Sequence, residues 1–317
     1  MKIVVPTKTY LTKTQNVNQK LIKPKSIIDS IQKLIELFKS NNGKVLILTG
    51  AGISTDSGIP DYRGPKGTYV INENYRPIFY HEFASLHQFR QRYWARSYLG
   101  WPLMKKAKPN ISHYALSNLQ SNNYILKIIT QNVDELHQKS GSKNILELHG
   151  SLSQIHCLNC GHIKQRSDYQ SILSDLNPKW NDFLKNIELG KITPIVRPDG
   201  DIDLPHGTSY DSFNYLSCIK CSNGIYKPSI IFFGENIKDS IKNETIDLVK
   251  NCKSILVIGS SLATYSAFRI VKLASDLGKD IVIINLGETR GDNLSFLKID
   301  FPCGDLLPAI ADQLTKL

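Results

Sequence analysis

At 317 residues the chain is long enough to bury a large core and to hold one large domain with a smaller one beside it. Apolar residues make up 41% of the sequence and charged residues 21%, and no apolar run approaches the roughly 20 residues of a membrane-spanning helix. We therefore expect a globular protein with no membrane partner.

The net charge of +11 is concentrated at one end of the chain. Residues 1–28 contain six lysines and no acidic residue, so more than half of the excess lies there, and we expect no nucleic acid as a primary partner. An acid-free leader with several hydroxyl residues is typical of organelle transit peptides, although these favour arginine and this leader has none. We interpret residues 1–25 as a transit peptide, with a disordered lysine-rich tail as the alternative.

Six short apolar runs determine the expected fold, and each ends abruptly in glycines or polar side chains. The runs are residues 45–49, 124–130, 145–148, 230–233, 255–258 and 281–284. Continuous apolar runs are typical of parallel strands buried on both faces, and ligands bind beyond the carboxyl ends of such strands. We predict an α/β fold, a doubly wound, Rossmann-like parallel sheet built from residues 26–150 and 227–317. Residues 65–112 show no strand periodicity, and there we expect a loop followed by short helices.

The most informative strand end is Gly50-Ala51-Gly52-Ile53-Ser54, which runs on to Ile59-Pro60-Asp61-Tyr62-Arg63-Gly64. Glycines after a buried strand let backbone N–H groups approach a phosphate closely, because no Cβ stands in the way. A lone Gly-x-Gly is weak evidence, since most such turns bind nothing. The continuation is more restrictive, because making a turn does not require those residues.

Polar side chains follow two further strands. Asn132 and Asp134 come after the run 124–130, and they either hydrogen-bond a carboxamide or ribose or merely form a turn. His149 ends the next run, and an imidazole with an ordinary pKa near 6.5 suits general-base work at neutral pH. Because parallel strands end at one edge of a sheet, we expect these side chains to meet the glycine turn in one crevice.

Two cysteine pairs predict a metal site. Cys157-x-x-Cys160 and Cys218-x-x-Cys221 can each form a tight knuckle around one ion, and four thiolates favour tetrahedral Zn²⁺ with no open position for chemistry. Reactive dithiols are the weaker alternative, because neither pair follows a strand as a redox motif would. We predict one structural zinc in an inserted small domain, residues 151–226, whose long insert between the pairs covers another part of the protein.

Taken together, the motifs resemble the sirtuins, in the family's order and over about residues 26–310. The motifs are Gly50 to Ser54 with Gly58 to Arg63, Thr130 to Asp134, Leu148-His149-Gly150, both cysteine pairs, Phe232 to Glu235, Gly259 to Leu262, and Asn285 to Gly287. The run Arg90 to Arg96, with Gly100-Trp101-Pro102, is similar to the class II, sirtuin-4-type branch, which is mitochondrial. A location in the mitochondrial matrix is therefore implied, with the cytoplasm as the alternative.

The resemblance implies an NAD-dependent protein lysine deacylase that moves the acyl group to ADP-ribose and releases nicotinamide. His149 and Asn132 would be catalytic, with His149 taking a proton from a ribose hydroxyl. The implied cofactor contacts are Gly50, Ala51, Gly52, Ser54, Asp61, Tyr62, Arg63, Gln131, Asn132, Asp134, Gly259, Ser260, Ser261, Asn285, Leu286, Gly287 and Cys303. In this comparison residues 65–112 hold a cofactor loop and a helical module.

The resemblance also implies how substrate binds. Phe233, Gly234 and Glu235 would pair with an acyl-lysine protein as an added strand. Tyr93 and Arg96, three residues apart and so on one helix face, resemble the pair with which desuccinylating sirtuins hold an acidic acyl chain. We therefore expect a preference for acidic or branched acyl groups, with a surface arginine beside an aromatic helix as the alternative.

Two other functions remain open. Mono-ADP-ribosyl transfer to a protein would use the same NAD pocket and differ only in the nucleophile. An NAD-sensing module without catalysis would not need His149, Asn132 or Asp134. All three residues are present, so this function is disfavoured.

Overall fold

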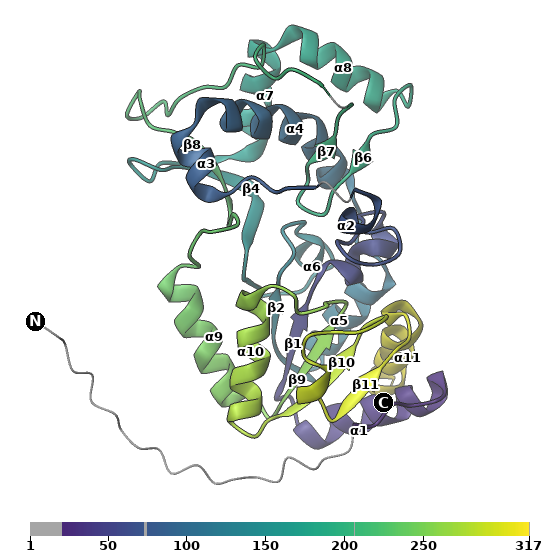
Figure 1. The fold of residues 1–317 in the computed structure, drawn as a ribbon. Coiled ribbons are helices and arrows are strands. Elements are labelled where there is room, and N and C mark those ends of the chain that lie inside the picture. Colours follow the sequence, from purple (N-terminus) through teal and green to yellow (C-terminus); the bar gives the residue numbers. More distant parts are fainter. Residues whose placement is uncertain (1–20, 73–74, 206, 317) are drawn as a thin grey trace, which may run out of the picture.

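The computed structural model describes residues 21–72, 75–205 and 207–316, so most of the expected leader, residues 1–25, lies outside the described residues. Figure 1 shows two parts, a parallel sheet covered by helices and a smaller part stacked beyond one edge of it. Within the described ranges, no helix is both long and apolar enough to cross a bilayer.

The large part is built on a six-stranded parallel sheet with the order β11-β10-β9-β1-β2-β3. Its strands are β1 Val45–Thr49, β2 Ile125–Thr130, β3 Leu146–Glu147, β9 Ser254–Ile258, β10 Asp280–Ile284 and β11 Leu297–Ile299. The chain moves outward from β1 to β2 and β3, then returns to the other side of β1 with β9. This reversal between β1 and β9 makes the sheet doubly wound, as predicted, and marks the place where such sheets bind ligands.

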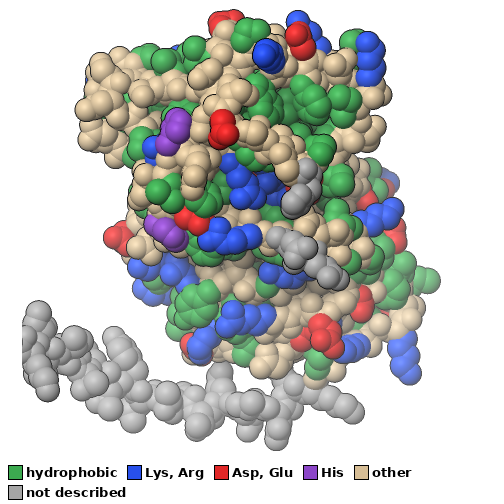
Figure 2. Space-filling model, turned by 45° about the horizontal axis from the view of Figure 1, so that its top comes forward, with side chains coloured by type: hydrophobic (Ala, Val, Ile, Leu, Met, Phe, Trp, Pro, Cys, Tyr) green, Lys and Arg blue, Asp and Glu red, His purple; other side chains and the backbone are tan. Residues whose placement is uncertain are grey.

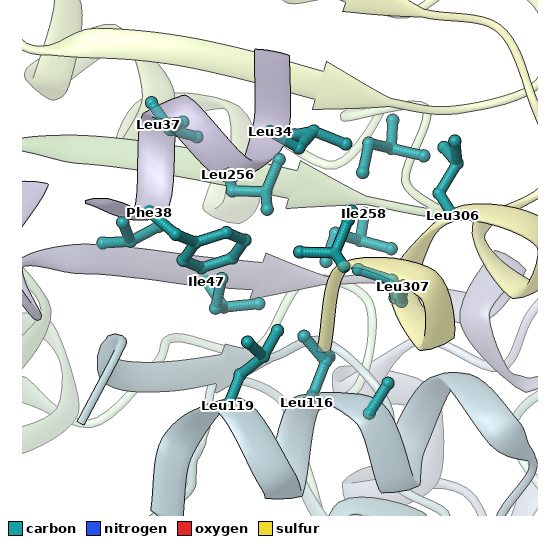
Figure 3. Close-up of a cluster of buried hydrophobic side chains, with 14 of the residues drawn as sticks. Leu34, Leu37, Phe38, Ile47, Leu116, Leu119, Leu256, Ile258, Leu306 and Leu307 are labelled. Carbon is teal, nitrogen blue, oxygen red and sulfur yellow. The ribbon is translucent and has the colours of Figure 1, made fainter. Parts of the chain in front are cut away.

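Helices cover both faces of the sheet. On one face α1 Ile27–Asn41, α5 Ile111–Ser121 and α11 Cys303–Thr315 bury leucines and the ring of Phe38 against β1 and β9 (Figure 3). On the other face lie α9 Asp239–Asn251 and α10 Tyr265–Asp276. All five residues of β1 are buried, which explains its unbroken apolar sequence.

Local sequence signals explain where helix α1 begins and ends. The Ser26 hydroxyl accepts a hydrogen bond from the N–H of Asp29 at 3.1 Å and caps the helix. Asn42 and Gly43 both have left-handed backbone, with φ of 47° and 73°, and turn the chain into β1.

The small part has its own antiparallel sheet, in the order β5-β4-β8. Its strands are β4 Gly150–Cys157, β5 Ile163–Gln165 and β8 Tyr226–Ile230, with a separate hairpin of β6 Ile195–Val196 and β7 Ile202–Asp203. Its helices are α3 Tyr80–Ser85, α4 His87–Lys106, α7 Arg166–Leu176 and α8 Pro178–Glu188. The remaining short elements are η1 Ala51–Ser57, α2 Thr68–Ile71, α6 Leu136–Lys139 and η2 Asp292–Leu294.

Two expectations about individual elements are wrong, and one strand was missed. Residues 230–233 do not form a strand of the parallel sheet, because the chain there ends β8, which pairs antiparallel with β4. Strand β11 was not expected, since it is only three residues long. The expected short helices within 65–112 include α4, a helix of 20 residues. Helix α4 is buried around most of its circumference, so its sequence shows no one-sided apolar stripe.

Helix α4 packs with the cysteine-bearing segment. Trp94, Tyr98 and Leu99 share one core with Tyr169 and Phe213, which lie between the cysteine pairs. The core of the small part therefore combines residues from 65–112 with residues from 151–226.

Candidate active site and metal centre

A cavity of about 960 Å³ lies between the carboxyl edge of the parallel sheet and the small part. Its lining includes each residue expected to bind cofactor or substrate or to act in catalysis, and the four cysteines lie elsewhere. On the face drawn in Figure 2, Lys and Arg side chains gather between the two parts. The structure thus brings together strand ends that are far apart in sequence.

A cradle of three glycines lies at the switch point of the sheet. The N–H groups of Gly50 and Gly52 donate to the carbonyls of Ile258 and Gly259, at 3.0 and 2.9 Å. A Cβ on Gly52 would come within 2.9 Å of Gly259, and Gly259 itself has φ of +60°. Backbones this close, at the start of η1, leave a side-chain-free surface that fits the phosphates of a dinucleotide such as NAD.

Three polar side chains stand beside this cradle in one network. The Ser54 hydroxyl donates to Oδ2 of Asp134 at 2.7 Å, and Nδ2 of Asn132 donates to Ser54 Oγ and to the Gly50 carbonyl, each at 3.1 Å. Burial raises the pKa of Asp134, although the N–H of Leu136 and the Ser54 hydroxyl both donate to its carboxylate. These bonds fix Asn132 and Asp134 against the cavity, beyond what a turn alone requires.

His149 is held in a defined tautomer. Its Nδ1 lies 3.1 Å from the carbonyl oxygen of Gln131, and its Nε2 lies 2.8 Å from Ser266 Oγ. Because a carbonyl only accepts, Nδ1 carries the hydrogen and Nε2 keeps the lone pair. Burial lowers the pKa of His149 to about 4, so the imidazole is neutral at pH 7 and can accept a proton at Nε2.

Gln131 connects this base to the far side of the cavity. Its side-chain Nε2 donates to Ser260 Oγ at 2.8 Å, and Thr264 donates to its Oε1 at 3.3 Å. Ser260 in turn accepts from the N–H of Leu262 at 3.2 Å, while the Ser261 carbonyl accepts from the N–H of Arg290.

The loop after η1 closes one wall. Asp61 accepts from the N–H groups of Arg63 and Gly64, at 3.1 and 2.7 Å, which folds the loop back on itself. The Arg63 guanidinium lies over the ring of Tyr69 at 4.8 Å, and Tyr62 packs against the same ring. Burial raises the pKa of Tyr62 well above its ordinary value.

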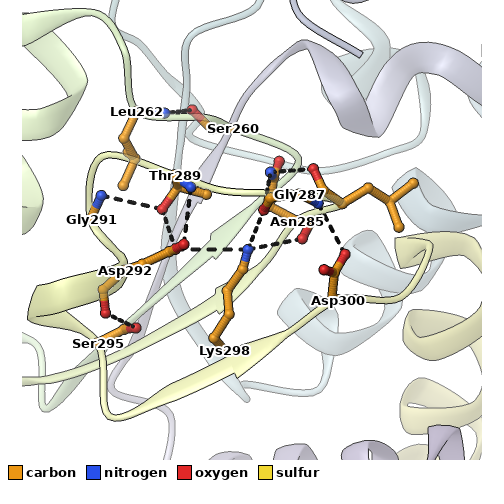
Figure 4. Close-up of polar contacts among 11 residues, drawn as sticks. Ser260, Leu262, Asn285, Gly287, Thr289, Gly291, Asp292, Ser295, Lys298 and Asp300 are labelled. Atoms are coloured by element: carbon orange, nitrogen blue, oxygen red, sulfur yellow. Dashed lines mark hydrogen bonds and ion pairs between the residues drawn. The ribbon is translucent and has the colours of Figure 1, made fainter. Parts of the chain in front are cut away.

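A buried lysine organises the opposite wall, which Figure 4 shows in detail. Lys298 on β11 donates from Nζ to the carbonyl of Asn285 at 3.0 Å and to that of Gly287 at 2.5 Å. Asp300 accepts from the N–H of Gly287 at 3.0 Å, so the turn from Asn285 to Gly287 is held from both ends. Leu286, between them, is exposed, and Cys303 lies nearby at the start of α11 beside Ser112. Lys298 was missed from the sequence, where one lysine in a short strand gives no signal.

The residues expected to pair with substrate lie where the small part returns to the sheet. The carbonyl of Phe233 accepts from the N–H of Tyr80 at 2.9 Å, so this carbonyl is bonded within the chain. Gly234 has φ of +78°. Glu235 is bound to the buried ammonium of Lys227 at 3.0 Å and accepts from the N–H of Phe232, which gives its carboxylate a structural contact.

Tyr93 and Arg96 both line the cavity from α4. The Tyr93 hydroxyl is buried without a hydrogen-bond partner among the described residues. The Arg96 guanidinium is bonded to Asp201 at 3.1 Å, to Asp203 at 3.4 Å and to the carbonyl of Ile202 at 2.8 Å. Arg96 is therefore neither an exposed surface arginine nor a free cation.

The insert between the cysteine pairs reaches into the same cavity. Its residues Arg197, Asp199 and Asp201 line the cavity, and the Arg197 guanidinium lies 4.0 Å above the ring of Tyr75. These cavity residues were missed from the sequence. The unusual length of the insert was the available signal. It predicted that the insert would cover another part of the protein, but not that this part would be the cavity.

The four cysteines form a second site inside the small part. The sulfur atoms of Cys157, Cys160, Cys218 and Cys221 all lie within 4.8 Å of one another. N–H groups of Asn159 and Lys220 point at the sulfurs of Cys157 and Cys218, as around thiolates. Four thiolates at this spacing fit one tetrahedral zinc ion and leave no open position.

The neighbouring histidines are occupied elsewhere. His156 is bonded to Ser229 at 3.1 Å, and His162 to the hydroxyl of Tyr226 at 2.8 Å.

Comparisons with known proteins agree with this geometry. The family model described as "Sir2 family" matches residues 50–266. The chain is 42% identical to the NAD-dependent protein deacylase SIR4 of Batrachochytrium dendrobatidis, over 91% of this chain and 96% of that protein. It is 40% identical to the mitochondrial NAD-dependent protein lipoamidase sirtuin-4 of Bos taurus, over 89% of this chain and 85% of that one.

Solved structures of Sir2 proteins also match this chain. A structure of Sir2 with a p53 peptide and NAD⁺ superposes with a TM-score of 0.65 at 28% identity, covering 90% of this chain and 99% of the other. With its doubly wound sheet, its glycine cradle, its neutral histidine and its four-cysteine cluster, the chain belongs to the Sir2 family, the sirtuins.

Proposed function

We infer that this sirtuin is an NAD-dependent protein lysine deacylase, which moves an acyl group from lysine to ADP-ribose and releases nicotinamide. The observation that carries this inference is the neutral imidazole of His149 in the cavity that also holds the glycine cradle. The names of the similar proteins, which are NAD-dependent deacylases and deacetylases, support the same reaction.

Bound NAD supplies a ribose carbon that the acyl oxygen attacks as nicotinamide leaves. The side-chain-free backbone of Gly50, Gly52 and Gly259 would accommodate the phosphates, and Asn132 and Asp134 would orient the ribose and carboxamide end. His149 accepts a proton at Nε2 from a ribose hydroxyl, while its Nδ1–H stays bonded to the Gln131 carbonyl. A base that is neutral at pH 7 is ready for this step without first losing a proton.

The acyl-lysine protein binds as an added strand along Phe233 and Gly234. Solved Sir2 structures that contain peptides support a peptide substrate, and an exposed backbone segment is where a peptide can add as a strand. Since the Phe233 carbonyl is bonded to the N–H of Tyr80, the substrate pairs with the backbone that follows it.

We propose a preference for acidic or branched acyl groups over acetyl. Tyr93 and Arg96 face the cavity, and the buried Tyr93 hydroxyl has no partner among the described residues. Burial raises the pKa of Asp201 to about 6, so this acid gives up its charge more readily than an ordinary aspartate. An acyl carboxylate that displaces Asp201 would therefore find Arg96 already in position.

One assay tests the reaction. Nicotinamide release and acyl-ADP-ribose are measured on a panel of acetyl, glutaryl, succinyl, branched and lipoyl peptides, with the His149→Gln variant beside the wild type. We expect release with at least one peptide and a loss of about 10²- to 10⁴-fold in the variant. NAD binding without release on the whole panel would instead indicate an NAD-sensing module. Label from radioactive NAD that moves onto protein would indicate ADP-ribosyl transfer.

A second assay tests the acyl preference. In the Arg96→Met variant, turnover of the glutaryl peptide should fall at least tenfold more than turnover of the acetyl peptide. Equal losses on both peptides would reject the role of Arg96 in choosing the acyl group.

We also propose that the protein acts in the mitochondrial matrix. The acid-free leader and the mitochondrial bovine relative support this location. A fluorescent protein fused behind residues 1–25 should enter mitochondria, and the full chain without residues 1–20 should stay in the cytoplasm. A fusion that stays in the cytoplasm would favour the cytoplasmic alternative.

A further inference from the structure

The lone pair that makes His149 a base is already occupied in the protein. Ser266 lies in the first turn of α10, half-buried and lining the cavity, with its Oγ 2.8 Å from Nε2. The other ring nitrogen donates to the carbonyl of Gln131, so the only hydrogen available between Nε2 and Oγ is that of the serine hydroxyl. Ser266 therefore donates to Nε2.

A neutral imidazole has a single lone pair, and it lies in the plane of the ring. A hydroxyl that gives its proton to Nε2 must therefore either expel the Ser266 hydroxyl or use it. The serine oxygen has two lone pairs of its own, so it can accept a hydrogen bond from the cavity while it donates to Nε2. Its position in the lining of the cavity exposes it to a ligand bound there.

We propose that Ser266 is the proton relay of this active site, which carries a proton from the bound ribose hydroxyl to Nε2 of His149. The hydroxyl O–H bond of the ligand breaks and its electron pair stays on that oxygen, while a new O–H bond forms at Oγ. At the same time the original Oγ–H bond breaks, and its proton forms the Nε2–H bond. One proton leaves the ligand, one arrives at His149, and Ser266 is unchanged.

Ser266 has a second role in this proposal, which is to stabilise His149 once its imidazole is protonated. The start of α10 carries the positive end of the helix dipole, which disfavours an imidazolium beside it. Among the described residues, burial is the leading cause of the low pKa of His149, and no charged side chain contributes to it. When Nε2 gains a proton, the Ser266 oxygen accepts from it and so stabilises the charge formed during the reaction.

The proposal rests on the deacylase reaction, but its first test does not need that reaction. In the free, full-length protein at pH 7, the ¹⁵N shift of Nε2 of His149 should be that of a hydrogen-bonded nitrogen. It should move toward that of a free lone pair in the Ser266→Ala variant and stay in place in Ser266→Thr. The matched control is Ser275→Ala at the other end of α10, which should leave the shift unchanged. An identical Nε2 shift in wild type and Ser266→Ala would overturn the proposal.

The second test is kinetic. The kcat of Ser266→Ala should fall about 10- to 100-fold with an unchanged dissociation constant for NAD, and Ser266→Thr should recover most of the loss. A relay moves two protons in one step. The rate is therefore measured in mixtures of light and heavy water: a plot of the wild-type rate against deuterium fraction should be curved, and the same plot for the residual Ser266→Ala rate should be a straight line. A wild-type kcat for Ser266→Ala, or equal curvature in both proteins, would reject the relay. Absence of nicotinamide release from the wild type would reject the deacylase reaction, while the NMR result would still stand.

Discussion

The guanidinium of Arg96 on α4 lies 3.1 Å from Oδ2 of Asp201, an acid supplied by the insert between the two cysteine pairs. The side chains of both residues are almost fully buried, with exposed fractions of 5% and 11%. In the acyl pocket proposed above, a free arginine and one already paired with an acid would select different acyl groups, so this contact would determine whether the pocket accepts an acidic acyl chain.

Loss of the Asp201 charge should favour acidic acyl groups. In Asp201→Asn, Arg96 keeps its bonds to Ile202 and Asp203 but loses its nearest negative charge. The ratio of kcat/KM for glutaryl over acetyl peptides should therefore rise. Each 1.4 kcal/mol of interaction free energy gained between Arg96 and the acidic acyl group would raise this ratio about tenfold. The control is Asp239→Asn, an exposed acid at the start of α9. An unchanged ratio in Asp201→Asn would show that Arg96 does not contact the acyl group.

Lys298 should control cofactor affinity rather than chemistry. In Lys298→Met the carbonyls of Asn285 and Gly287 lose their donor, and the turn between them loosens. We expect KM for NAD to rise about tenfold with kcat within about threefold of wild type, and stability to fall by about 1–3 kcal/mol. Lys272→Met, an exposed lysine on α10 paired with Asp276, serves as the control. A fall in kcat at unchanged KM would contradict this role.

Glu147 should make the protein less stable above neutral pH. Burial raises the pKa of Glu147 to about 7, from the 4.5 of an ordinary glutamate, and the Gln138 amide donates to it at 2.7 Å. Between these two pH values the folded state binds more protons than the unfolded state, so stability falls as pH rises through that window.

The variant Glu147→Gln removes this cost. Its free energy of unfolding should exceed that of wild type by about 1–2 kcal/mol at pH 8, a figure reduced for the partial exposure of the group, and the two should be equal at pH 4. Denaturant unfolding at both pH values measures the difference. A gain of the same size at pH 4 would mean that packing, not the carboxylate charge, is responsible.

One zinc ion per chain should depend on the cysteine cluster. Cys218→Ser should abolish bound zinc, measured by elemental analysis, and should lower the unfolding temperature, because the cluster packs with Tyr226 and Tyr169 in the core of the small part. Cys252→Ser, a buried thiol at the end of α9, should keep its zinc. Full zinc content in the Cys218 variant would show that three thiolates suffice.

The parallel sheet was predictable because a strand buried on both faces has a continuous apolar sequence, as Val45–Thr49 does. The site was predictable for the same reason, since Asn132 and His149 follow strands whose ends meet at one edge. Helix α4 was harder to predict, because burial on nearly all sides erases the periodicity that identifies a surface helix.

The contacts of the insert could not be predicted in the same way. Asp201 reaches Arg96 only through the packing of the small part, and neither residue has a local pattern that points to the other. Likewise the bond between Ser266 and His149 joins the start of a helix to the end of a strand. Such pairs follow from tertiary geometry, after the elements themselves are known.

The first described residues bear on how the chain can be shortened. Ile22 forms a parallel bridge with Leu297 of β11. The N–H of Ile22 donates to the carbonyl of Phe296, and the carbonyl of Ile22 accepts from the backbone N–H of Lys298. Strand β11 ends the sheet, and Ile22 covers part of its free edge with backbone partners. A protease that trims the chain before Leu21 leaves this cover in place, whereas a cut after Lys25 would bare an unpaired strand, the kind of surface through which proteins aggregate.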